Sequence, residues 1–247
     1  MEIDRHSVFS RTALLLGMDA VEALKRLRVA VFGVGGVGGW CAESLVRSGV
    51  GHLTIVDSDC VCDSNVNRQV MATSRTIGQM KVEALRERLL EINPDAEIVA
   101  EARVYSAETS GTFNLDGFDY VVDAIDSVQA KAHLINTVTR LEHPVLISSM
   151  GAARKSDPFR IRRSEFWKVQ GDGLARALRR RFRQLGEFPA KKFACVWSDE
   201  PPAPSRAGDA LGSAVHVTGM FGFALAGLVL QGATGRFSSC AARGNMQ

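Results

Sequence analysis

A short apolar run followed at once by a glycine-rich turn constrains this chain more than any other feature. Residues 29–32 read Val-Ala-Val-Phe, a pattern typical of a buried parallel strand. Gly33, Gly35 and Gly38 follow in the Gly-x-Gly-x-x-Gly spacing, with Gly36 between them. The first glycine permits a tight bend, the second lets the backbone approach a phosphate, and the third lets helix and strand pack closely. The pattern predicts an anion-binding turn at a helix N-terminus.

The residues after the turn support this interpretation. A helix is expected over 40–48 and a second apolar strand over 52–56. Asp57 follows that strand, 24 residues beyond Gly33, a spacing that suits a ribose hydroxyl. The alternative is a glycine turn with a purely structural role. The motif does not identify the nucleotide, and the polar residues that follow argue against the usual nicotinamide dinucleotide.

Composition is that of an ordinary soluble enzyme, with 46% hydrophobic and 23% charged residues in 247. The five cysteines are an odd number without a Cys-x-x-Cys pair, so neither a disulfide framework nor a structural zinc is expected. A reducing, cytoplasmic compartment is the simplest interpretation, and the N-terminus does not resemble a signal peptide. Residues 212–233 are apolar, and we expect a helix buried against a sheet, with membrane association as the alternative.

Charge is unevenly distributed along the chain. Residues 151–192 hold thirteen lysines and arginines against four aspartates and glutamates, a net charge of +9. The whole chain carries +3, so the remainder carries −6. A basic segment on an acidic chain predicts a polyanionic partner. Its densest part is the run Arg179, Arg180 and Arg181 with Arg183, for which nucleic-acid contact and a solvated helix face remain open alternatives.

Apolar segments and helical patterns alternate along most of the chain. Strands are expected over 29–32, 52–56, 97–104, 118–124 and 145–149, and helices over 40–48, 77–92 and 131–140. The alternation predicts an α/β fold with a Rossmann-like, mostly parallel sheet flanked by helices. Additional C-terminal strands (160–166, 193–197) and a helix (172–185) are expected. No linker divides residues 1–247, so we expect one unit with a helical arm (1–27), a nucleotide-binding core (28–150) and a substrate-facing part (151–235).

Polar residues follow two of the expected strands. Residues 58–69 hold more hydrogen-bonding side chains than a plain connector needs, and Lys81 lies near the start of the next helix. The strand expected over 118–124 ends in a stretch that holds Asp123, Asp126 and Ser127. Because ligands in such sheets bind at the carboxyl ends of the strands, both aspartates are well placed.

Five motifs in order resemble the ubiquitin-activating-enzyme-like superfamily, which includes the molybdopterin and thiamine sulfur-carrier adenylyltransferases. They are GVGGVG, VDSD, SNVNRQ, IGQMK and DAIDS. Within the superfamily, the chain is most similar to the tRNA threonylcarbamoyladenosine dehydratases. The supporting stretches are DRHSVFSRTALLLG, SSMGAARKSDPFRIR, GLARALRRRFRQLG and WSDEPP.

The resemblance implies a role for individual residues. Asp57 would bind the ribose, Asn65 and Arg68 the phosphates together with Lys81, and Asp126 would bind Mg²⁺. Arg11 would reach the nucleotide of the other subunit in a homodimer, so we expect Arg11, Arg68, Lys81 and Asp126 to be catalytic. The alternatives are structural roles: loop caps for Asp57 and Asp126, a turn former for Asn65, and solvated charges for Arg11, Arg68 and Lys81. The expected ATP-binding set is Gly33, Gly35, Gly36, Gly38, Asp57, Asp59, Asn65, Arg68, Gln69, Lys81, Asp123, Asp126 and Ser127.

The chain also departs from its relatives. The sulfur-carrier enzymes commonly hold zinc with two Cys-x-x-Cys pairs, which are absent from this sequence. The dehydratases commonly carry another glycine in the stretch that corresponds to residues 151–153, where this chain has alanine. Cys62 and Cys195 invite a thioester hypothesis, although an inert thiol is the more common role of such residues.

The resemblance implies an ATP-dependent dehydration of threonylcarbamoyladenosine in tRNA through an acyl-adenylate. The alternative enzyme would adenylate the C-terminus of a ubiquitin-like sulfur carrier. A third possibility is a nucleotide-binding module in a sulfur-relay assembly. The expected partners are modified tRNA, a second copy of the chain and a sulfur-relay protein, but not DNA.

Overall fold

The computed structural model describes residues 8–204 and 211–235, and its centre is one seven-stranded sheet. The strand order is β3-β2-β1-β4-β5-β7-β6, and every neighbouring pair is parallel except β6 with β7. This confirms the expected α/β fold. The strands are β1 (Arg28–Phe32), β2 (His52–Val56), β3 (Glu97–Glu101), β4 (Tyr120–Asp123), β5 (Val145–Ser149), β6 (Ile161–Glu165) and β7 (Ala194–Ser198).

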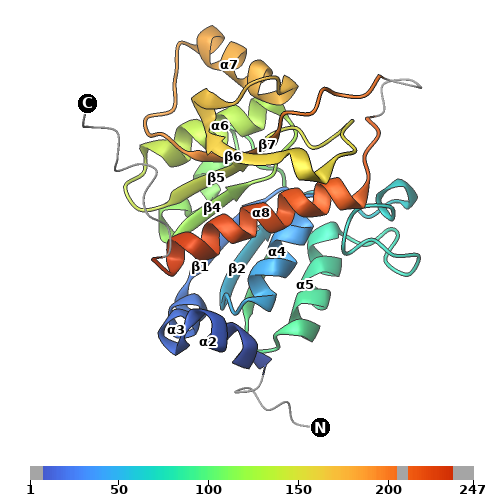
Figure 1. The fold of residues 1–247 in the computed structure, drawn as a ribbon, viewed down its shortest axis with the longest axis vertical. Helices are drawn as coiled ribbons and strands as arrows, with labels where there is room; N and C mark the ends of the chain where they lie inside the picture. The colour runs from blue at the N-terminus through green and yellow to red at the C-terminus, as the bar shows by residue number, and fades with distance from the viewer. Residues whose placement is uncertain (1–7, 205–210, 236–247) are drawn as a thin grey trace.

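Two layers of helices cover the sheet (Figure 1). Val29 and Val31 of β1 belong to the core cluster of one face, while Ala30 and Phe32 belong to the cluster of the other. This alternation buries both faces of each central strand, which explains the apolar runs. The first face packs against α4 (Gly38–Arg47), α5 (Lys81–Ile92) and α8 (Val215–Ala233), and the second against α6 (Val128–Arg140) and α7 (Gly173–Leu185).

Helix α8 lies across α4 at the front of the view in Figure 1. Glycines let α8 approach its neighbours closely: a Cβ at Gly222 would lie 2.5 Å from the carbonyl oxygen of Val37 at the start of α4, and one at Gly232 would lie 2.3 Å from the hydroxyl of Tyr120 in β4. By length and composition α8 is the single candidate membrane span among residues 8–204 and 211–235. Half of that span is buried inside the fold, as expected of a core helix.

The N-terminal arm consists of α2 (Ser10–Leu16) and α3 (Met18–Arg26). Helix α3 is anchored by buried Val21 and Leu24, and the Leu24 carbonyl accepts the N–H of Gly51 just before β2. The arm therefore lies at the amino ends of the strands. Helix α2 buries none of its residues, and Leu14 and Leu15 are 81% and 71% exposed.

One expected strand is shorter than the sequence indicated. Strand β3 ends at Glu101 instead of residue 104. Arg103 Nε donates to Glu101 Oε2 (2.8 Å), and its Nη1 donates to Thr112 Oγ1 (2.7 Å). These bonds turn the chain away from the sheet, and the segment that follows borders the site described next.

Candidate functional site

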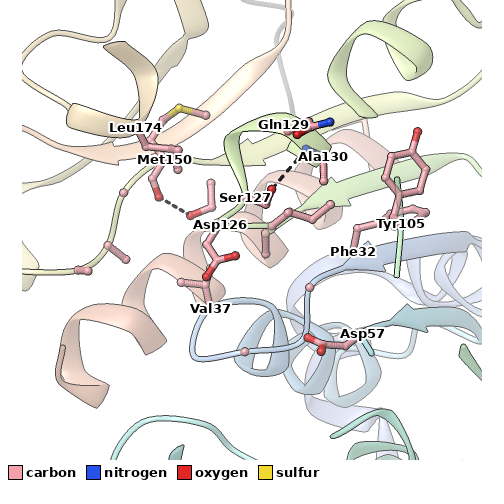
Figure 2. Close-up of a pocket in the computed structure, with 18 of the residues that line it drawn as sticks. Phe32, Val37, Asp57, Tyr105, Asp126, Ser127, Gln129, Ala130, Met150 and Leu174 are labelled. Atoms are coloured by element: carbon pink, nitrogen blue, oxygen red, sulfur yellow. Dashed lines mark hydrogen bonds between the residues drawn. The ribbon is translucent and has the colours of Figure 1, made fainter. Parts of the chain in front are cut away.

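A cavity of about 1190 Å³ opens at the carboxyl ends of β1, β2, β4 and β5 (Figure 2). The strand order reverses between β1 and β4, because β1 continues to β2 on one side and β4 continues to β5 on the other. In open α/β sheets such a switch point forms the ligand crevice. The volume exceeds the roughly 300–1,000 Å³ of an ordinary small-molecule pocket, so the cavity has room for two reactants.

The three motif glycines have three different surroundings. Gly33 has a φ of +82°, and a Cβ there would lie 2.8 Å from the Ala124 carbonyl oxygen. At Gly38 a Cβ would lie 1.9 Å from the Gly33 carbonyl oxygen. At Gly35 the nearest atom is 3.8 Å away, on the Gln69 side chain at the cavity. Gly33 and Gly38 are therefore required by the turn, whereas Gly35 leaves its backbone accessible to a ligand.

Asp57 fastens the glycine turn to the end of β2. Its Oδ2 accepts the Val34 N–H at 2.9 Å, and its Oδ1 accepts the Asp59 N–H at 3.0 Å. The carboxylate also lines the cavity. Because each carboxylate oxygen has further lone pairs, Asp57 can support the turn and still accept from a ribose hydroxyl.

Lys81 lies at the start of α5, facing two acidic groups. Its Nζ is 2.7 Å from Asp59 Oδ2 and 4.0 Å from Asp57 Oδ1, and its side chain is 8% exposed. All three residues line the cavity. The ammonium group is thus held at the cavity wall by carboxylates.

The polar loop after β2 contributes the residues of the N-x-x-R-Q motif. Arg68 Nη1 donates to the Ser64 carbonyl (2.7 Å) and to Asn67 Oδ1 (2.9 Å). Asn65 Oδ1 accepts the Cys62 N–H (3.2 Å), so this side chain also forms the turn. Gln69 Oε1 is buried and has no partner among the described residues. The cavity is lined by Asn65, Arg68 and Gln69 together with Gly36, which lies against Arg68.

Asp126 and Ser127 occupy the turn between β4 and α6. Figure 2 shows the Asp126 side chain between this turn and Val37 of the glycine-rich turn. Asp126 is exposed, and in the described parts of the chain no cation forms an ion pair with it. Ser127 Oγ accepts the Ala130 N–H at 3.5 Å and begins α6. Both side chains are open to the cavity.

Asp123 differs from its expected placement in the site. Its carboxylate is fully buried, 2.8 Å from Lys131 Nζ, and accepts from Ser148 Oγ at 2.7 Å. Lys131 Nζ also donates to the Ile125 carbonyl at 3.0 Å, and the Ile125 N–H donates back to Asp123 Oδ1 at 3.2 Å. Asp123 is absent from the cavity wall. Its structural role is to hold, with Lys131, the turn that carries Asp126.

Arg11 is exposed on α2, at the end of the sheet opposite the cavity, and does not line it. The structure of one chain therefore does not bring Arg11 together with the other candidate residues. Any contact between Arg11 and a nucleotide requires a second chain.

The wall facing the nucleotide motifs comes from residues that motif reasoning missed. Lys155 Nζ donates to the Ser198 carbonyl (2.6 Å) and lies 3.7 Å from Asp172 Oδ2. Burial lowers the pKa of Lys155, against the opposing effect of Asp172. Arg154 has a φ of +61°, unusual for a residue with a side chain. The other members of this wall are His133, Asn136, Arg140, Gly151, Ala152, Ala153, Asp172, Leu174 and Arg181.

Burial acts on one thiol and one phenol near the site. Burial raises the pKa of the Cys195 thiol well above its usual value, which keeps it protonated. Cys62 is exposed and lies 3.3 Å from Ser64 Oγ. Burial also raises the pKa of Tyr105 to about 12, and its hydroxyl lies 3.1 Å from His133 Nδ1. Nothing here supports a thiolate nucleophile at Cys195.

The four arginines at positions 179–183 of α7 separate into three groups. Arg179 Nη2 donates to the carbonyls of Phe166 (2.8 Å) and Val169 (2.6 Å), so it is a structural residue rather than a free contact. Arg181 points to the cavity wall. Arg180 and Arg183 are exposed. The sequence does not distinguish these four arginines, because their contacts depend on which side of the helix each side chain faces.

Comparisons with known proteins agree with this geometry. The model of the ThiF family matches residues 9–245. The tRNA threonylcarbamoyladenosine dehydratase of Bacillus subtilis is 43% identical over 194 residues, covering 78% of this chain and 75% of that protein. The Escherichia coli tRNA N6-threonylcarbamoyladenosine dehydratase in complex with ATP has a TM-score of 0.87 at 33% identity, covering 95% of this chain and 97% of that chain.

A molybdopterin-synthase adenylyltransferase is also similar, over a shorter length. The Salmonella typhimurium protein is 38% identical over 129 residues, which cover 51% of each chain. The dehydratases thus match much more of the chain than this adenylyltransferase does. Since the family model covers nearly all of its residues, the chain belongs to the ThiF family.

Proposed function

We propose that this chain is an ATP-dependent dehydratase that cyclises threonylcarbamoyladenosine in tRNA. The observation that carries the proposal is a single cavity with two walls. One wall holds the nucleotide motifs, and the other is formed by residues of α6 together with Arg154, Lys155 and Arg181 of the basic segment 151–192. A relative with this activity is similar over nearly the whole structure and binds ATP.

The reaction activates a carboxylate. The threonyl carboxylate attacks the α-phosphorus of ATP, and pyrophosphate leaves, which gives an acyl-adenylate. The carbamoyl group of the same base then attacks the acyl carbon, releases a proton and expels AMP with its bonding electrons. The sum is the loss of one water from the base, with ATP converted to AMP and pyrophosphate. Because the nucleophile is intramolecular, no catalytic cysteine is needed.

The residues on the nucleotide wall divide the work. The N–H groups of the glycine-rich turn, with Arg68 and Lys81, would neutralise the phosphates as charge moves between them. Lys81 would exchange part of its pairing with Asp59 for the phosphates. Asp57 would hold the ribose, and Gln69 Oε1, which lacks a partner, would accept from the ligand or a water. The motif glycines position the backbone that makes these contacts.

The donor set also fits Mg²⁺. Residues 8–204 and 211–235 hold no cluster of three metal-ligating side chains, but Mg²⁺ is commonly bound by one or two carboxylates and substrate phosphates. Asp126 offers such a carboxylate, exposed at the cavity. When bound there, the ion would neutralise phosphate charge.

A homodimer would complete the site. Helix α2 presents Leu14 and Leu15 to solvent and carries Arg11 on the same short helix. If the two leucines were buried against a second chain, Arg11 would lie against that chain as well. Mixing Arg11→Ala with Lys81→Ala subunits should restore activity, because one composite site is then intact. No recovery despite proven subunit exchange would exclude the shared site.

The alternative function is adenylation of a ubiquitin-like sulfur carrier, favoured by the 38% identity to the molybdopterin-synthase adenylyltransferase. It would use the same nucleotide wall but a protein C-terminus as the carboxylate. A sulfur-relay protein would serve as a partner in either function, and it is part of the proposal. We also propose a cytoplasmic location, where both tRNA and ATP are present.

The test combines the purified protein with ATP, Mg²⁺ and tRNA that carries threonylcarbamoyladenosine. Mass spectrometry of the nucleosides should show the loss of one water, and pyrophosphate release should require the modified tRNA. Unmodified tRNA is the matched control. Pyrophosphate release that depends on a carrier C-terminus would support the alternative, and binding without turnover would contradict both. Calorimetry should show ATP binding and negligible NAD binding.

A further inference from the structure

Buried polar atoms without partners gather along the cavity. Among residues 8–204 and 211–235 five buried side-chain atoms lack a partner, and three of them, Gln69 Oε1, Asn136 Oδ1 and Arg181 Nε, belong to residues that line it; Ser164 Oγ and Trp197 Nε1 do not. Gln69 belongs to the nucleotide wall. Asn136, which is 3% exposed, and Arg181 lie at the other end, where α6 packs on α7. Since nearly all buried polar groups in proteins have partners, this second end has the chemistry of an unfilled polar site.

The second end lies well away from the glycine-rich turn. Asn136 lies nine residues beyond Ser127, the N-cap of α6, and Arg181 lies nine residues beyond Asp172, the N-cap of α7. Nine residues of helix extend about 13 Å. A nucleotide held at the glycine-rich turn and Asp126 would therefore leave this end to a different part of the reactants.

The groups at this end are two guanidinium groups, the Asn136 side-chain amide and the Glu187 carboxylate. Arg140 also lines the cavity. Its Nη1 donates to the backbone carbonyl of Asn136, and its Nη2 lies 3.5 Å from Glu187 Oε2. Two guanidinium groups thus face a space that also holds the unpartnered Asn136 Oδ1. A guanidinium binds a phosphate through two parallel hydrogen bonds. A side-chain carbonyl accepts from a hydroxyl, and the ribose 2′-hydroxyl is the group that distinguishes RNA from DNA.

We propose that Asn136, Arg140 and Arg181 form a subsite, the α6–α7 subsite, that holds one ribose-phosphate unit of the RNA strand. Arg181 and Arg140 bind the phosphate, and Asn136 accepts the 2′-hydroxyl. The inference rests on the proposed function, because it assigns this unit to the strand that carries the reacting base. It orients that base so that its acyl group points toward Asp126, and these residues act by positioning.

The test uses an RNA hairpin that carries threonylcarbamoyladenosine, with one phosphate at a time replaced by a neutral methylphosphonate. One replacement should weaken binding to the unaltered protein about tenfold. The same replacement should cost Arg181→Met almost nothing, because the two changes remove one interaction. Arg181→Lys keeps the charge but loses the fork, so we expect intermediate affinity. Arg75→Met, an exposed arginine outside the cavity, is the matched control.

A second arm tests Asn136. Replacing the 2′-hydroxyl of the same nucleotide by hydrogen should weaken binding to the unaltered protein and leave Asn136→Ala unaffected. Thermal denaturation identifies a variant that fails to fold. Asn136→Asp then replaces it: its carboxylate keeps an acceptor, so this variant should still be weakened by loss of the 2′-hydroxyl, and insensitivity would contradict the subsite.

Each outcome decides a separate point. If the unaltered protein dehydrates the hairpin but no phosphate couples to Arg181, the subsite is wrong and the proposed function stands. If Arg181→Met weakens ATP binding instead, Arg181 binds the phosphates of ATP and the inference is overturned. If the unaltered protein forms no product, the proposed function itself fails.

Discussion

The two walls of the cavity differ in how their residues are connected in the sequence. The nucleotide wall uses short motifs, each of which forms one turn at the end of one strand, such as residues 33–38 after β1. The facing wall assembles Asn136, Lys155 and Arg181 from three separate segments. Motif spacing therefore predicts the nucleotide wall but not the facing wall. Each wall is supported by a buried ion pair, Lys131 with Asp123 behind the nucleotide wall and Lys155 with Asp172 in the facing wall, and beyond the facing wall α7 presents arginines to solvent.

The largest effect should come from removing the buried support of the nucleotide wall. Lys131→Met leaves the Asp123 carboxylate charged and unpaired in the core, which costs about 3–5 kcal/mol of folding free energy. Urea unfolding measures this loss. The control is Lys131→Met combined with Asp123→Asn, which leaves no charge behind and should recover part of the stability. A single variant as stable as the unaltered protein would contradict the support role.

The next effect separates two glycines of the same turn. Gly38→Ala places a methyl group 1.9 Å from the Gly33 carbonyl oxygen, so we expect a loss of about 3 kcal/mol, since overpacking costs roughly 1–3 kcal/mol or more. Gly35→Ala meets no atom closer than 3.8 Å and should fold normally but bind ATP more weakly. Thermal unfolding and calorimetry measure both properties. Equal stability of the two variants would remove the distinction.

Arg180 and Arg183, both exposed on α7, should contribute to tRNA binding without contributing to ATP binding. Replacing Arg180 and Arg183 by glutamate should weaken tRNA binding about tenfold and lower the salt dependence, because fewer counterions are released. Filter binding at two salt concentrations, with a sizing column, measures the effect. An intact dimer with unchanged tRNA affinity would place the tRNA surface elsewhere. Arg179 is unsuitable for this test because it binds three backbone carbonyls.

The smallest effect concerns pH. Burial alone would raise the pKa of Glu43. Hydrogen bonds from Arg88 and Arg47 lower this pKa, and together with the charges of both arginines they outweigh burial, so the pKa lies below its usual value. A carboxyl group whose pKa is lowered in the folded state stabilises the fold at pH values above its unfolded-state pKa of about 4.3. This stabilisation is lost as the pH falls through the folded-state pKa. Glu43→Gln should be less stable by about 1 kcal/mol at pH 7, the size of one hydrogen bond. Urea midpoints of both proteins should converge below about pH 4; a constant difference would contradict this.

Individual residues show where sequence reasoning reached its limit. Asp123 and Asp126 stand three positions apart after the same strand, and both were expected in the site. Only Asp126 faces the cavity, because Asp123 is the last residue of β4 and its side chain points into the layer with Lys131. Arg179 and Arg181 are likewise two positions apart on α7 and face different surroundings.

Sequence alone was sufficient for the α/β fold, the order of strands and helices, and the nucleotide motifs. These features depend on local patterns: apolar runs, glycine spacing and the polar residues that directly follow a strand. The tertiary structure was required for the facing wall, for the buried partner of Asp123 and for the end of the cavity near Asn136. Those features depend on which distant segments pack together, and burial can turn a charged residue into either a support or a ligand-binding group.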